Sequence, residues 1–265
     1  MSDVPTGLPD ASPEVRSAFE RLLLGLADTK RILGIRYSDW LLGAPSIEAG
    51  IAASSMAQDE WGHARLLYAT LRDFGEDPEL LEHDRPASEY ASWDPLDEPF
   101  ANWASVTAGM TVVDGALALA LEAVLEGEYE PLRGRLEKML GEEEFHRSLA
   151  HAWFNRLARS QGEGRERLRE AVEAVLPATL RCMAPDDRSH RRLAETGLTL
   201  PAAELRTRLA RLLNPLLAPL DLSVSAVQTE VPEGWDGTRG RGPGHPAEEA
   251  VERARGDLNR ALFVE

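Results

Sequence analysis

Four long helical segments, each with one apolar face, dominate this sequence. Apolar residues recur at steps of three and four along each segment, and runs that alternate as a strand does are scarce. Ser12 before Pro13, and Ser46 before the second segment, are helix N-cap signals. The segments are predicted at residues 13–42, 46–75, 103–126 and 130–158. These patterns predict an all-α fold.

The connections between the segments indicate how the helices pair. Short turns join the first helix to the second and the third to the fourth, whereas an acidic, proline-rich stretch at residues 76–100 joins the two pairs. Two helical hairpins joined by one long crossover are typical of a ferritin-like four-helix bundle. We expect a single domain over residues 1–265, with the bundle at 13–158 and additional C-terminal helices within 164–262. Those helices are predicted at 164–182, 201–213 and 246–262.

Charge and cysteine content exclude several classes of protein. The chain carries 45 acidic and 29 basic residues, and the resulting net charge of −16 disfavours nucleic acid or an anionic membrane as a partner. A single cysteine, Cys182, excludes an intrachain disulfide framework and a cysteine-rich zinc site. The N-terminus lacks the basic and apolar regions of a signal peptide, and no uninterrupted apolar run is long enough to span a bilayer. We therefore expect a soluble, cytoplasmic protein.

Ionisable residues interrupt the apolar faces near the middle of the helices. The second helix carries Glu60 and His63, and the fourth carries Glu143 and His146, so each pair projects from one helical face. Two such pairs facing each other, with Asp114 from the third helix, offer the ligands of a carboxylate-bridged dimetal site. The alternative is a polar core with only a structural role, in which each buried carboxylate still needs compensation. We predict that these five residues bind metal.

The first helix departs from this ligand pattern. Lys30 falls where a fourth carboxylate would complete the set, and Lys30 and Lys138 are the only lysines in the chain. Three carboxylates and one ammonium sum to −2, which suits one divalent ion, or none if the lysine is ion-paired with the acids. We therefore expect a half-filled or empty site modified by Lys30; the alternative is a lysine that extends to solvent beside the apolar face.

Several stretches resemble the bacterial multicomponent phenylacetyl-CoA epoxidase family, the phenylacetic acid catabolic proteins. The resemblance extends from about residue 15 to the end of the chain. Its strongest parts are residues 58–63, 113–116 and 142–146, together with the turn at 183–187. The family's complex contains two related ferritin-like subunits. One is catalytic and holds a di-iron site that activates O2 and epoxidises the ring of an aromatic CoA thioester, and the other is a structural partner with a degenerate site.

The resemblance implies cofactors and partners for this chain. It implies iron, as one ion, two or none, with manganese as an alternative metal. It also implies a homologous ferritin-like subunit and a reductase component as partners, and an aromatic CoA thioester as the substrate of the complex.

The sequence combines features of both subunits. Its metal-ligand motifs resemble those of the catalytic subunit, whereas residues 26–28, 38–40, 64–68 and 242–245 resemble the structural partner. The catalytic subunit has a glutamate where Lys30 stands. Our first interpretation is therefore a structural partner in an O2-dependent monooxygenase complex of phenylacetate catabolism. The alternatives are the catalytic di-iron subunit and a stand-alone ferritin-like oxidase or metal-binding protein.

Overall fold

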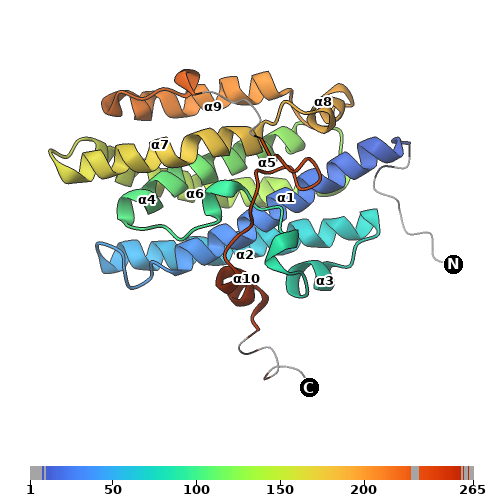
Figure 1. Ribbon diagram of the computed structural model, residues 1–265, viewed down its shortest axis with the longest axis horizontal. Coiled ribbons are helices and arrows are strands. Elements are labelled where there is room, and N and C mark those ends of the chain that lie inside the picture. Colours follow the sequence, from blue (N-terminus) through green and yellow to red (C-terminus); the bar gives the residue numbers. More distant parts are fainter. Residues whose placement is uncertain (1–7, 9, 228–232, 258, 260–261, 263–265) are drawn as a thin grey trace. The chain divides into compact units, whose positions relative to one another are not determined.

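The computed structural model describes residues 8, 10–227, 233–257, 259 and 262 (Figure 1). Contacts within the chain divide it into two compact units. Unit 1 comprises Met1–Pro99 and Gly234–Glu265, and unit 2 comprises Phe100–Glu233. The described parts of both units consist of helices, turns and loops, without a strand. The expected organisation as a single domain stays a prediction.

Unit 1 is built on a hairpin of two long helices, α1 (Pro13–Ser38) and α2 (Ile47–Leu71). The hydroxyl of Ser12 accepts a hydrogen bond from the backbone N–H three residues on, at 3.3 Å, and Ser46 does the same at 3.2 Å. Both predicted N-caps are therefore confirmed, and they satisfy N–H groups that have no partner within the helix. The two helices pack along their lengths.

Two short helices complete unit 1. The segment expected as a long connection, 76–100, contains α3 (Pro78–His83) and the 3₁₀ turns η2 (Ala87–Glu89) and η3 (Asp94–Leu96). Near the C-terminus, α10 (Glu248–Arg255) packs against both α1 and α3. The connection is thus an ordered layer on the hairpin.

A buried ion pair ties this connection to α1. The guanidinium of Arg85 donates to both carboxylate oxygens of Asp28, at 2.5 and 3.0 Å. The Tyr68 hydroxyl donates to the same carboxylate at 2.6 Å, and the Ala91 backbone N–H donates to it at 2.7 Å. Burial first, and then the charge of Asp28, raises the pKa of Tyr68 well above its ordinary value. The phenol therefore stays a neutral donor.

Unit 2 begins with a helical rod in three segments. These are α4 (Trp103–Ala108), the π-helical segment η4 (Gly109–Asp114) and α5 (Gly115–Leu125). Asn102 and Ser105 form a reciprocal capping box at its start. A π-helical turn widens the backbone spiral, so it changes the direction in which the side chains of the segment point.

Four further helices complete unit 2. They are α6 (Arg133–Ala158), α7 (Glu163–Met183), α8 (Arg188–Glu195) and α9 (Ala202–Leu217). In unit 2, α7 packs against α4 and α6, and α9 packs against α5 (Figure 1). The rod and α6 pack together as the second long helical hairpin.

The fold class is all-α and ferritin-like, as the sequence predicts. Helix bounds differ from the predicted ones in several places. Neither α8 nor the π segment was expected, because α8 buries few of its residues and a π turn has no simple sequence signal. Helix α9 continues through Pro215 to Leu217, and α10 ends at Arg255, where Gly256 has a φ of 75°. Part of the predicted last helix, at 258, 260 and 261, lies outside the described residues.

One described helical stretch, Trp103–Leu125, is long and apolar enough to cross a membrane. Its most apolar 18-residue window is 78% buried inside the protein. Such burial is what a core helix of a soluble protein shows, because its apolar side chains already have protein neighbours. The sequence search for uninterrupted apolar runs missed this stretch because Thr107, Thr111 and Asp114 break it. Location in the cytoplasm stays a prediction.

The Asp28–Arg85 pair generates a stability prediction. Arg85→Met leaves the buried Asp28 carboxylate without its cation, so the free energy of unfolding is expected to fall by about 3–5 kcal/mol. Urea denaturation followed by circular dichroism measures the change. Arg133→Met, which breaks an exposed ion pair with Glu130, is the matched control and should leave the midpoint unchanged. Equal effects of the two substitutions would contradict this role of Arg85.

Candidate metal centre

Unit 1 brings a lysine and a glutamate together in the α1–α2 hairpin. Lys30 on α1 and Glu60 on α2 both have side chains that are 0% exposed, and Lys30 Nζ lies 2.9 Å from Glu60 Oε1. His63 is also buried and lies three residues beyond Glu60, on the same face of α2. The hairpin thus places an ammonium directly on one of the predicted metal ligands.

The Lys30–Glu60 pair changes what Glu60 can do chemically. A carboxylate oxygen that accepts a charge-assisted hydrogen bond from an ammonium has less negative charge to offer a cation. Burying either charge without an opposite charge is costly, and each group compensates the charge of the other. In unit 1, the lysine therefore supplies a positive charge directly to this glutamate.

Unit 2 brings three predicted ligands together. Asp114 is the last residue of η4, and Glu143 and His146 lie one helical turn apart on α6. His146 Nδ1 lies 3.2 Å from Asp114 Oδ2 and 3.4 Å from Glu143 Oε2. All three side chains are about 2% exposed, and their ligand atoms lie within 4.8 Å of one another. Two carboxylates and one imidazole form a donor set that fits a divalent iron or manganese ion.

The π-helical segment gives Asp114 its place in this group. Pi turns inside α-helices often occur at functional sites, because the widened turn re-aims side chains. Asp114 ends the segment and is 2% exposed, on a helical rod whose other buried side chains are mostly apolar. The register of this carboxylate therefore depends on the π turn.

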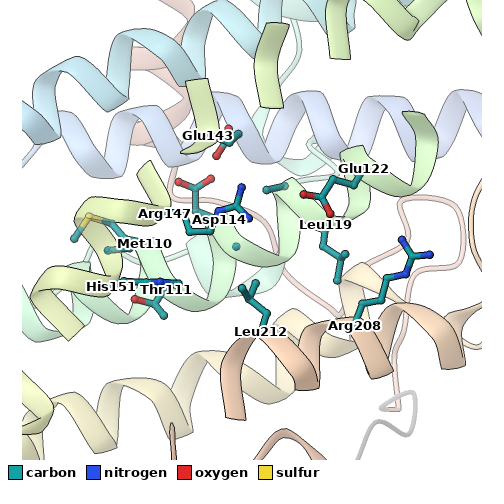
Figure 2. A pocket seen from close by; sticks show the side chains of 13 residues that line it. Met110, Thr111, Asp114, Leu119, Glu122, Glu143, Arg147, His151, Arg208 and Leu212 are labelled. Carbon is teal, nitrogen blue, oxygen red and sulfur yellow. The ribbon is translucent and has the colours of Figure 1, made fainter. Parts of the chain in front are cut away.

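A cavity of about 170 Å³ opens onto Asp114 and Glu143 within unit 2 (Figure 2). Four ionisable side chains in its wall were not predicted as functional: Glu122, Arg147, His151 and Arg208. Burial raises the pKa of Glu122, which Arg147 partly opposes. Burial first, and then the Arg147 charge, lowers the pKa of His151 below its ordinary value. The sequence carried no signal for this group, because its members come from different helices.

The structure thus divides the predicted site residues between the units. Lys30, Glu60 and His63 lie in unit 1, whereas Asp114, Glu143 and His146 lie in unit 2. Within each unit the expected neighbours are in contact. The assignment of the five residues as ligands of one shared metal centre stays a prediction.

Fold and donor groups define the class: an all-α, ferritin-like protein with buried carboxylate–histidine groups that could bind a metal. The family described as phenylacetic acid catabolic protein matches residues 8–253, and the chain belongs to this family. Its role accordingly lies in phenylacetate catabolism. The predicted family is therefore confirmed. No curated protein matches the chain.

The environment of His151 generates a titration prediction. Its NMR titration should have a midpoint below the ordinary value of 6.5, because burial and Arg147 both disfavour the imidazolium. Arg147→Gln should move the midpoint upward without restoring 6.5, since burial, the larger cause, remains. Arg135→Gln, about 24 Å along the same helix from His151, is the control and should not move it.

The sign of the stability effect follows from the direction of this shift. A histidine whose folded pKa is lowered contributes stability that is fully present above its unfolded pKa. That contribution is lost as pH falls through the folded pKa. A His151 midpoint at or above 6.5 would contradict the prediction.

Proposed function

We propose that this chain is the structural, ferritin-like partner in a multicomponent epoxidase of phenylacetyl-CoA type, with a degenerate dimetal site. The observation that carries the proposal is the buried ion pair between Lys30 and Glu60. Membership of the phenylacetic acid catabolic protein family supports the pathway, and the ion pair supports the non-catalytic role.

Charge counting supports a degenerate site. The predicted ligands include three carboxylates, those of Glu60, Asp114 and Glu143, and the ammonium of Lys30 reduces their summed charge to −2. Two divalent ions carry +4 and would leave a buried excess of positive charge, which is costly in a medium of low polarity. One ion, or none, agrees better with this donor set.

The predicted residues would hold iron in a defined way. Asp114, Glu143 and His146 in unit 2 supply two carboxylates and one imidazole, and Glu60 and His63 in unit 1 supply the remaining predicted donors. A complete dimetal site of this kind would supply the O2 activation that ring epoxidation requires. Lys30 holds Glu60 ionised and, as a bound cation, reduces the charge that a metal would have to balance.

The partners follow from this role. A structural ferritin-like subunit needs a catalytic homologue that completes the complex, and the complex needs a reductase for its electrons. The aromatic CoA thioester would be bound by the catalytic homologue. The strongly negative chain has no feature that favours nucleic acid.

One observation favours a second candidate function, the catalytic di-iron subunit. The three unit 2 ligands are already gathered within 4.8 Å and buried, as a working centre would require. A stand-alone ferritin-like oxidase would need the same centre. Metal content separates both from the structural role.

The test measures how many iron and manganese ions each chain binds. Plasma mass spectrometry gives this metal content for protein expressed with both metals supplied. The wild-type chain is expected to hold one ion or none, and Lys30→Glu about two, because the substitution restores the missing carboxylate. Lys138→Glu makes the same charge change at an exposed position on α6 and should match the wild type. About two ions in the wild-type chain would overturn the degenerate-site proposal, and so would a Lys30→Glu variant with no added metal.

Activity of the reconstituted complex tests the partner role. The chain is co-expressed with a catalytic homologue and the reductase, and epoxidation of phenylacetyl-CoA is followed. Omitting this chain should abolish or strongly reduce the rate, whereas Glu143→Gln in this chain should leave it unchanged. Loss of epoxidation in Glu143→Gln, with the complex still assembled by size-exclusion chromatography, would favour the catalytic candidate instead.

A further inference from the structure

Residues from the C-terminal half of α7 and from the segment after α9 line a groove on unit 2. The groove has a volume of about 620 Å³. A closed apolar cavity of roughly 150 Å³ is enough to hold one benzene molecule, so this groove has room for a longer ligand. Apolar side chains form much of its wall: Leu176, Pro177, Leu222, Ala226 and Val227.

Arg181 supplies a positive charge in the wall of this groove. The three other arginines of α7 have acidic partners, which pair Arg165 with Asp221, Arg167 with Glu163 and Arg169 with Glu173. Arg181 is partly exposed, and no hydrogen bond or ion pair joins its guanidinium to another described residue. Its Nε atom is buried, so a ligand in the groove would meet the two terminal nitrogens, Nη1 and Nη2.

The two carboxylates in the wall are already paired with arginines. Arg169 donates a hydrogen bond to Glu173 at 3.2 Å, and Arg165 donates one to Asp221 at 3.2 Å. Because these ion pairs carry no net charge, Arg181 gives the groove one positive charge, in a chain whose net charge is −16. An anionic ligand gains a favourable interaction with Arg181, whereas a cationic ligand is repelled.

Helical spacing puts apolar surface directly beside this charge. Residues four apart lie on one face of an α-helix, so Glu173, Pro177 and Arg181 follow one another along the groove. At a rise of about 1.5 Å per residue, Arg181 lies about 12 Å along the helix axis from Glu173. A ligand whose anionic group lies at Arg181 would therefore extend its apolar part over Pro177 and Leu176.

The single guanidinium matches a carboxylate better than a phosphate. A planar guanidinium binds a carboxylate through two parallel hydrogen bonds, and the two unit charges balance. A phosphate monoester carries about −1.5 to −2 at neutral pH, so one arginine would leave part of its charge uncompensated beside apolar side chains. The groove thus favours a ligand with one carboxylate.

We propose that this groove binds a monocarboxylate with an apolar body, whose carboxylate accepts hydrogen bonds from the terminal nitrogens of Arg181. The apolar body lies against Leu176, Pro177 and Leu222. The proposal goes beyond the structural role proposed above, since it gives this subunit a ligand site of its own. It depends neither on the metal content of the chain nor on a catalytic homologue.

The first probe is 8,8,8-trifluorooctanoate, followed by fluorine NMR on the full chain. It is expected to bind with a dissociation constant of about 1 mM or tighter, as suits a ligand of this size. Trifluoroacetate, which lacks the chain, and 8,8,8-trifluorooctylamine, which has the opposite charge, should each bind at least about 10-fold more weakly. Equal or tighter binding of the amine would overturn the proposed ligand class.

A second acid distinguishes the two kinds of apolar body. The probe 4-(4-fluorophenyl)butanoate carries an aromatic ring in place of most of the chain. Binding of either acid supports the site, and the tighter binder shows whether the groove prefers a chain or a ring. Failure of both acids to bind the wild type would overturn the proposal.

Paired arginine substitutions test the contact with the carboxylate. Arg181→Met removes the charge and keeps an apolar side chain, and it should weaken binding of the octanoate by at least about 10-fold. Arg181→Lys keeps the charge without the paired donors and should give an intermediate affinity. Arg188→Met makes the same charge change at an exposed position outside the groove wall and should have no effect. Equal effects of Arg181→Met and Arg188→Met would overturn the role of Arg181.

Filling the groove tests its location. Ala226→Trp, at an exposed position in the wall, should abolish binding, and circular dichroism checks that the variant is folded. The smaller cavity beside Asp114 is the competing site, and Ala118→Leu, which fills that cavity, should leave binding unchanged. Undiminished binding in folded Ala226→Trp, or lost binding in folded Ala118→Leu, would overturn the proposal. Metal content is measured separately, so failure here does not affect the test of the structural role.

Discussion

A lysine ammonium and a glutamate carboxylate, both shielded from water, form the ion pair on which the proposed function of this protein rests. Lys30 and Glu60 lie 2.9 Å apart in the α1–α2 hairpin, with neither side chain exposed. Burial of a single charge is costly, and the ion pair lowers that cost for both groups. Ferritin-like proteins commonly use such buried carboxylates as metal ligands. Here Glu60 instead lies against the ammonium of the Lys30 side chain. The proposed loss of a full dimetal site follows from this pair.

The buried charges also organise the rest of each unit. In unit 1, the carboxylate of Asp28 receives Arg85, Tyr68 and a backbone N–H from the long connection, which becomes an ordered layer on the hairpin. In unit 2, His146 lies between the carboxylates of Asp114 and Glu143. Both groups bring opposite or hydrogen-bonding partners to buried carboxylates, which lowers the free-energy cost of burying them.

Much of the fold could be predicted because helical periodicity and cap residues are local properties. Ser12 and Ser46 cap α1 and α2 as expected, and the three-residue spacing put His146 beside Glu143. Prediction failed where local signals are weak. The arginine-rich α8 has few buried residues, and the π segment that carries Asp114 depends on packing around the rod. The cavity wall was missed since its residues are distant in sequence and meet only in the folded unit.

The sequence by itself determined the all-α class, the family and the ionisable residues that interrupt the apolar helix faces. Helical periodicity, residue spacing and residue type can all be read without a folded structure. Only the tertiary structure decided which of those charges meet. It paired Lys30 with Glu60 and placed His146 between two carboxylates. The physical reason is that hydrogen bonds and ion pairs act over a few ångströms. Their partners are therefore chosen by packing between helices, which no single segment encodes.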